Sequence, residues 1–284
     1  MVADRIGNIV DAVYSNPTNY RGFIIVIATV FFAFQLYCDF SSYSNIAIGA
    51  AQVMGFRLSQ NFERPYFSKS IREFWKRWHM SLTSWFMDYL YFPLGGSRCS
   101  KARKYFNVMI VFMVSGLWHG SSFTFVVWGT LHGIYYIVEN LFSPVGDMLV
   151  RKFKIRTSSF GYKLSMILIN FILVDFAWLF FRATSFKNAV VLIKNIFYFN
   201  PSVFTDGSLY KLGLDSSNFF VAMLSLGIVF IVDLLQRTKN LRDELLKQNM
   251  VFRWSLYLTS AIVILIFGVY GSGYDIQQFI YSRF

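Results

Sequence analysis

Three histidines carry the side chains best suited to proton transfer in this sequence, and one of them lies in a membrane-length apolar stretch. His119 sits in GLWHGSS, inside residues 106–138, which contain no Asp, Glu, Lys or Arg. An ionisable group deep in a membrane is costly and indicates function by default. A neutral imidazole there could act as general base, taking a proton from a hydroxyl that attacks an ester or thioester carbonyl. The alternative is a buried histidine hydrogen-bonded between helices. The flanking glycines slightly favour catalysis, because they let a second backbone or a substrate approach closely.

The other ionisable candidates are weaker. His79 lies in a Trp-rich segment, where an amphipathic anchor is a simpler interpretation than a catalyst, and His132, in LHG, is better explained by packing. Asp39, Asp175 and Asp233 could each cap a helix, pair with a basic residue or orient a histidine. The sequence does not choose between these roles, although Asp175 is the most telling because Leu and Phe surround it.

Neither a metal centre nor a disulfide framework is expected. The three histidines lack the i, i+4 spacing of a helical metal pair, and there is no CxxC sequence. Cys38 falls at the end of an apolar run and Cys99 in a basic loop. We therefore expect no zinc site and no disulfide.

Membrane helices must position these residues, because the composition lies outside the soluble range. Aromatic residues make up 20% and charged residues 15% of the 284 residues. Crossing the hydrocarbon core takes roughly 20 apolar residues. The runs that fit are residues 22–38, 106–138, 164–181 (interrupted only by Asp175), 216–232 and 254–274. No cleavable signal peptide is expected, because the first twenty residues lack an apolar core. The predicted fold class is an all-α, polytopic integral membrane protein.

The net charge of +12 is concentrated beside these runs. Residues 57–104 hold ten Lys or Arg against three acids, residues 151–163 hold five with no acid, and residues 237–253 hold five. The positive-inside rule places all three segments in the cytoplasm. Anionic lipid headgroups are the simpler partner for basic clusters beside membrane spans, so we expect no nucleic acid partner.

Residues 106–141 have to enter and leave the membrane, since both flanking basic segments are placed in the cytoplasm. Their 36 residues are too few for two full crossings. We therefore expect two short, tilted or re-entrant segments that meet near residues 116–122, with His119 deep at the turn. Such irregular backbone is tolerated only where it is buried in protein or lines a cavity.

The remaining segments complete one membrane-embedded domain, residues 1–284, with residues 57–104 as its cytoplasmic basic interfacial segment. Residues 183–215 are expected outside the cytoplasm, where Ser185 is placed to cap a short amphipathic helix through Phe199. No repeat of the kind that marks inverted-topology transporters is present.

Residues 68–92 predict an interfacial helix. Apolar residues recur at helical spacing, and His79 lies on the apolar edge one turn from Trp75. Trp on the apolar face and Lys or Arg on the other fit a helix at the headgroup level. The helix is expected to end at Pro93, Gly95 and Gly96.

Three stretches together resemble a known family. FQLYCDFSSYSNIAIGAAQVMGF, NFERPYFSKSIREFWKRWHMSLTSWFMDYLYFPLGG and GLWHGSSFTFVVWGTLHG resemble, in order and spacing, the membrane-bound O-acyltransferase family and its bacterial alginate O-acetyltransferase branch. WLFFRATSFKNA and the terminal FIYSRF add to the resemblance, which covers residues 23–284. The family normally has further spans before the first stretch, so the resemblance is to the C-terminal portion of its fold. The departures from the family pattern are Ser42, Asn45, Met87, Ser282 and Arg283.

The resemblance implies an acyltransferase with two site residues. His119 in GLWHG matches the family's essential histidine, and His79 in FWKRWH matches the polar residue paired with it. It implies a tunnel in which a thioester enters from the cytoplasm and its acyl group leaves toward an extracytoplasmic acceptor.

The resemblance also implies reactants and a location, the bacterial plasma membrane. Acetyl-CoA would be the donor, with its phosphates attracted by residues 57–104. The acceptor would be a cell-surface polysaccharide, reached directly or through an extracytoplasmic partner. One alternative in the family is transfer of D-alanine from a carrier-protein thioester to teichoic acid. Another, from a different class, is a non-catalytic membrane scaffold or transporter.

Overall fold

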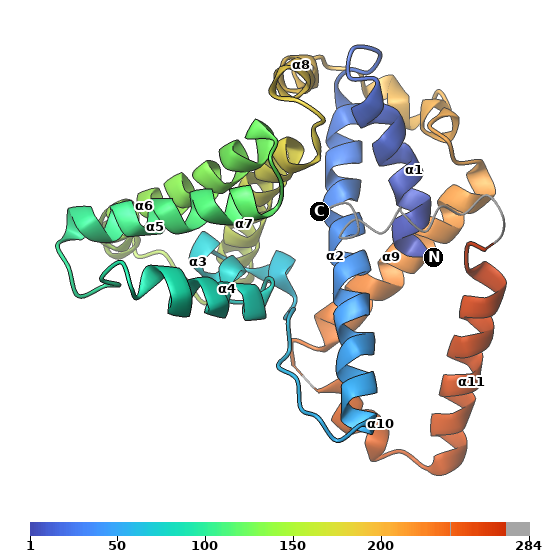
Figure 1. Cartoon of the computed structure of the whole chain (residues 1–284). Coiled ribbons are helices and arrows are strands. Elements are labelled where there is room, and N and C mark those ends of the chain that lie inside the picture. The colour runs from blue at the N-terminus through green and yellow to red at the C-terminus, as the bar shows by residue number, and fades with distance from the viewer. Residues whose placement is uncertain (239, 271–284) are drawn as a thin grey trace. The chain divides into compact units, whose positions relative to one another are not determined.

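The computed structural model describes residues 1–238 and 240–270, in which every regular element is helical (Figure 1). The longer helices are α1 (Val2–Ser15), α2 (Phe23–Val53), α5 (Lys101–Trp118), α6 (Phe123–Lys152), α7 (Phe160–Arg182), α8 (Phe186–Ile196), α9 (Ser216–Leu235) and α11 (Met250–Phe267). The shorter pieces are η1 (Pro65–Phe67), α3 (Ile71–Trp75), α4 (Met80–Phe86), η2 (Met87–Tyr91), η3 (Pro201–Phe204), η4 (Ser208–Lys211) and α10 (Leu241–Leu246). Within the described chain, α2, α7, α9 and α11 are long and apolar enough to cross a membrane. The predicted all-α membrane class is confirmed.

These four helices correspond to four of the predicted spans, with different bounds. The run predicted to end at Cys38 continues as helix to Val53, because residues 39–53 contain one charge and no proline. The span predicted over residues 254–274 is helical only to Phe267, and residues 271–274 lie outside the described residues, as does the terminal FIYSRF.

The described chain divides into two compact units, residues 1–39 with those from 198 onward, and residues 40–197. In the first unit, α1 buries one face formed by Ile6, Ile9, Val10 and Val13. This spacing is the i, i+3, i+4, i+7 pattern of an amphipathic helix. The helices expected from the sequence included none in these first twenty residues.

In the second unit, α5 and α6 lie side by side (Figure 1). Glycines set this approach, since a Cβ at Gly129 would lie 2.1 Å from the carbonyl oxygen of Phe112, and one at Gly116 would lie 2.3 Å from that of Phe125. The prediction that two segments meet near residues 116–122 is confirmed. The expectation of short segments is wrong for α6, which has 30 residues and continues through charged positions to Lys152.

Residues 68–92 do not form the single helix that their periodicity predicts. The chain breaks between α3 and α4 at His79, whose backbone is left-handed (φ 44°, ψ 55°). Residues 61–63 supply backbone hydrogen bonds here in place of those of a continuous helix. Glu63 N donates to Arg77 O at 2.9 Å, and Met80 N donates to Asn61 O at 3.0 Å. Phe74 is buried in protein, whereas Trp85 is 52% exposed, so only part of this segment offers an interfacial face.

The amphipathic helix predicted after residue 183 is confirmed as α8. The Ser185 hydroxyl accepts a hydrogen bond from Asn188 N at 3.1 Å and caps the helix. The helix ends at Ile196 rather than Phe199.

Candidate active site

The turn between α5 and α6 presents His119. The His119 backbone N–H donates to Gly116 O at 3.1 Å, closing the last turn of α5. A Cβ at Gly120 would lie 2.6 Å from the Phe125 ring, so the chain needs glycine here. Ser122 then caps α6 by accepting from Thr124 N at 3.4 Å. The position of His119 therefore follows from glycine and serine at defined places in the turn.

The imidazole of His119 lies in an aromatic enclosure built by three helices. It is 4% exposed. Its ring centroid lies 4.9 Å from that of Trp118, 5.2 Å from Trp128 of α6 and 5.1 Å from Phe181 of α7, each ring meeting it edge to face. Edge-to-face pairs are a preferred arrangement of aromatic rings, each stabilising by about 0.5–1.5 kcal/mol. The imidazole is thus held in one orientation with little access to water.

His79 lies on the break between α3 and α4. It is 9% exposed, and its Nδ1 lies 3.3 Å from Asn61 Oδ1. The same amide oxygen accepts from the Ser81 backbone N–H at 3.1 Å and from the Ser81 hydroxyl at 2.9 Å. A tautomer with the proton on Nδ1 satisfies this contact and leaves Nε2 as the basic nitrogen.

Trp118 brings the two histidines together. Its ring centroid lies 4.9 Å from that of His119 and 6.5 Å from that of His79. The indole is 51% exposed. Two residues far apart in the sequence therefore meet around one aromatic ring, and together they can offer two imidazole nitrogens to a bound substrate.

His132 is a core residue. Its side chain is fully buried, stacks on Phe74 (6.1 Å between centroids, 7° between planes) and accepts a hydrogen bond from Trp75 Nε1 at 3.3 Å. Its ring also contacts Trp128, which in turn contacts His119. These contacts agree with the packing interpretation of His132.

The three aspartates have other surroundings. Asp233 accepts a hydrogen bond from the Tyr37 hydroxyl at 2.9 Å within the first unit, to which Asp39 also belongs. Asp175 lies on α7 six residues before Phe181. Six residues turn a helix by about 240° beyond one full turn, so Asp175 points away from the face that meets His119.

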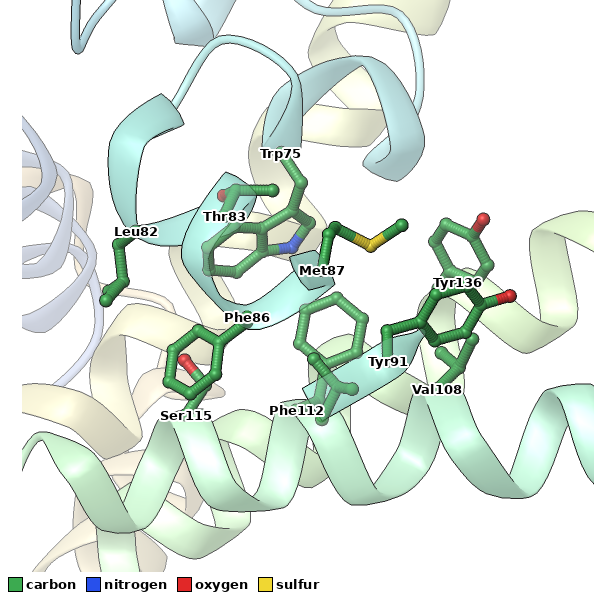
Figure 2. A pocket seen from close by; sticks show the side chains of 11 residues that line it. Trp75, Leu82, Thr83, Phe86, Met87, Tyr91, Val108, Phe112, Ser115 and Tyr136 are labelled. Carbon is green, nitrogen blue, oxygen red and sulfur yellow. The ribbon is translucent and has the colours of Figure 1, made fainter. Parts of the chain in front are cut away.

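A largely apolar cavity of about 150 Å³ lies in the second unit (Figure 2). Side chains from α3, α4 and η2, including Trp75 and Thr83, form one part of its wall. Side chains of α5, including Ser115, and Tyr136 of α6 form the rest. Thr83 follows His79 by one helical turn and Ser115 precedes His119 by one turn, so the cavity lies one turn from each histidine.

Among the described residues, no group of three His, Cys, Asp or Glu side chains could hold a metal ion, and both cysteines are free thiols.

In the basic segment 57–104, Arg64 pairs with Glu63 at 2.7 Å and Arg77 pairs with Glu73 at 2.6 Å. Its exposed cations include Lys69, Lys76, Arg98, Lys101 and Arg103.

The fold and site define a helical membrane protein in which two histidines from different elements share one aromatic neighbour, Trp118. The family model for the membrane-bound O-acyltransferases matches residues 2–186, so the chain belongs to this family. The match begins earlier than the resemblance read from the sequence and includes α1.

The relatives that the chain matches are named as O-acetylases, an O-acetyltransferase and D-alanyltransferases. The chain is 31% identical over 274 residues to the "Probable alginate O-acetylase AlgI" of Pseudomonas putida, covering 94% of this chain and 54% of that protein. It is 35% identical to the peptidoglycan O-acetyltransferase of Helicobacter pylori (69% and 36% covered) and 30% identical to the teichoic acid D-alanyltransferase of Bacillus subtilis (55% and 40% covered). The chain spans about half the length, or less, of these relatives.

Sequence reasoning missed the residues that hold the histidines. Asn61 has no periodic relation to His79, and Phe181 comes from a separate helix. Trp128 had a readable signal, because it lies four residues before His132 on the same face of a helix. The contacts of Asn61 and Phe181 required the tertiary structure.

Proposed function

We propose that this protein is an O-acyltransferase of the bacterial plasma membrane. In this proposal an acyl group, acetyl in the first instance, passes from a cytoplasmic thioester to hydroxyls of a cell-surface polysaccharide, directly or through an extracytoplasmic partner. The observation that carries the proposal is the meeting of His119 and His79 around Trp118 in a chain of this family.

The proposed chemistry assigns His119 as the general base. Its neutral imidazole accepts the proton of the acceptor hydroxyl while the oxygen attacks the thioester carbonyl. The new C–O bond forms as the C–S bond breaks, and the thiolate leaves with the proton from the imidazolium. His79, whose Nδ1 faces Asn61, presents Nε2 to the same substrate and positions it. The aromatic enclosure limits water, which would otherwise hydrolyse the thioester.

The proposed donor is acetyl-CoA, bound from the cytoplasmic side. The exposed cations of residues 57–104 would attract its phosphates. The name of the Pseudomonas putida relative supports acetyl transfer to a polysaccharide, and that of the Helicobacter pylori relative supports O-acetylation of the cell wall.

The test is complementation of a deletion strain with the complete gene. Ester-linked groups are released from surface polymers with mild base, and acetate and D-alanine are measured in the same samples. We expect restored acetate. Restored D-alanine without acetate would favour the second candidate, D-alanyl transfer, which the similarity to the Bacillus subtilis enzyme supports. Restoration of neither would leave the scaffold or transporter interpretation.

Replacing His79 tests its positioning role. His79→Ala is expected to lower kcat by about 10- to 100-fold, because a misplaced reactant costs about this much. The measurement is transfer from radiolabelled acetyl-CoA in membranes with matched protein levels. The exposed Tyr89→Ala, on the following η2, is the control. Unchanged transfer in His79→Ala would return this residue to the role of an anchor.

The apolar cavity gives a prediction about donor binding. We propose that it receives the alkyl part of the thioester, because its wall lies one turn from both histidines. Val111→Phe, which adds bulk to the wall, is expected to raise the KM for the donor about 10-fold, since one misfitting group costs about 1–3 kcal/mol. Val111→Ala, which leaves the space open, should bind normally. An equal KM in both variants would contradict this assignment.

A further inference from the structure

Helix α3 is anchored at its N-terminus by a carboxylate from another helix. Glu139 of α6 accepts hydrogen bonds at Oε2 from the backbone N–H groups of Ile71 (2.7 Å) and Arg72 (3.4 Å). Ser70 Oγ accepts from the next donor, Glu73 N, at 3.1 Å. The first N–H groups of a helix have no partner within it. Here α6 supplies the acceptor for two of these three.

The same helix holds α3 at two further points. The Arg72 guanidinium donates to Asn140 Oδ1 at 2.6 Å and lies 5.5 Å from the centre of the Tyr136 ring. One turn further along α3, Trp75 Nε1 donates to His132 Nδ1 at 3.3 Å. His132 and Glu139 are about two turns apart on α6. The position of α3 along α6 is therefore defined at both ends.

Placement of α3, together with the contacts of Asn61 and Glu63, determines placement of His79. Arg77 N and Trp78 N both donate to Phe74 O at 2.9 Å, so a hydrogen-bonded turn connects α3 to His79. At its other end α6 carries Trp128, whose ring contacts His119 at 5.2 Å. Helix α6 thus contacts His119 directly and holds His79 through α3.

We propose that Glu139 is a positioning residue for acyl transfer, acting through α3 to hold His79 in register with His119. The inference rests on the proposed function for its kinetic consequence. Its role requires an acceptor oxygen at the start of α3 rather than a proton donor.

Paired substitutions separate this role from general destabilisation. Glu139→Ala removes the acceptor and is expected to lower kcat about 10- to 100-fold with the donor KM unchanged. Glu139→Gln keeps an amide oxygen within reach of the Ile71 N–H and is expected to restore activity to within about 3-fold of wild type. Asp147→Ala, at an exposed position on the same helix, is the matched control and should behave as wild type. A Gln variant as impaired as the Ala variant would overturn the proposal.

A double-mutant cycle tests whether the effect passes through His79. In a His79→Ala background, Glu139→Ala is expected to lower the residual kcat no further, because residues that act through one another are not additive. Full additivity of the two losses would overturn the proposal.

Hydrogen exchange provides a readout that does not depend on activity. In lipid nanodiscs, amides in residues 69–80 should exchange at least about 10-fold faster in Glu139→Ala than in wild type or Glu139→Gln, because the anchored start of α3 is released. Unchanged exchange in Glu139→Ala would overturn the positioning role. Absence of transfer by the wild type, with the exchange difference present, would instead contradict the proposed function.

Discussion

His119→Ala is expected to reduce acyl transfer by about 10²- to 10⁴-fold, the contribution typical of a general base. The enclosure by Trp118, Trp128 and Phe181 leaves this imidazole as the basic group at the α5–α6 turn. The measurement is ester-linked acetate on surface polymers, with membrane protein matched by immunoblot.

A second variant separates catalysis from packing at this position. His119→Asn keeps a polar side chain of smaller but related shape and has no basic nitrogen. We expect it to be as inactive as His119→Ala while it accumulates to the wild-type level. Transfer retained by either variant at matched abundance would show that His119 is not the base.

Among glycine-to-alanine substitutions in the second unit, Gly129→Ala is expected to lower the stability of the protein most. The added Cβ would lie 2.1 Å from the Phe112 carbonyl oxygen, so α5 and α6 must separate. Overpacking of this kind costs about 1–3 kcal/mol and occasionally more. Because His119 ends α5 and Trp128 neighbours Gly129 on α6, transfer should fall as well.

Gly146 provides the matched control for Gly129 on the same helix. A Cβ at Gly146 meets no atom within 4 Å, and alanine stabilises a helix interior by roughly 0.5–1 kcal/mol relative to glycine. Thermal unfolding in detergent, followed by size-exclusion chromatography, should give a lower midpoint for Gly129→Ala and an equal or higher one for Gly146→Ala. Equal midpoints for both variants would mean that the close approach of α5 and α6 is not needed.

The membrane helices could be predicted from the sequence because their signal is local. Length, high apolar content and few charged residues define α7 and α9 without reference to any other part of the chain. The turn after α5 is also local, since it needs only the glycines and Ser122 in GLWHGSS. The family membership followed from short motifs in the sequence, among them GLWHG at this turn.

The break at His79 was decided by the tertiary structure. Residues 68–92 have helical periodicity throughout, yet Asn61 and Glu63 form hydrogen bonds with the backbone of residues 77–81 and separate α3 from α4 there. The periodicity of apolar residues indicates which face of a helix is apolar. It does not indicate hydrogen bonds made by a distant segment.

The sequence by itself therefore determined that this is a helical membrane protein of this family with His119 at a glycine-rich turn. Which rings enclose His119, which amide contacts His79, and how Glu139 anchors α3 were decided only by the tertiary structure. The physical reason is that these contacts join residues far apart in the sequence, whose relative positions depend on tertiary packing, such as the close approach of α5 and α6 at Gly116 and Gly129, rather than on any local pattern.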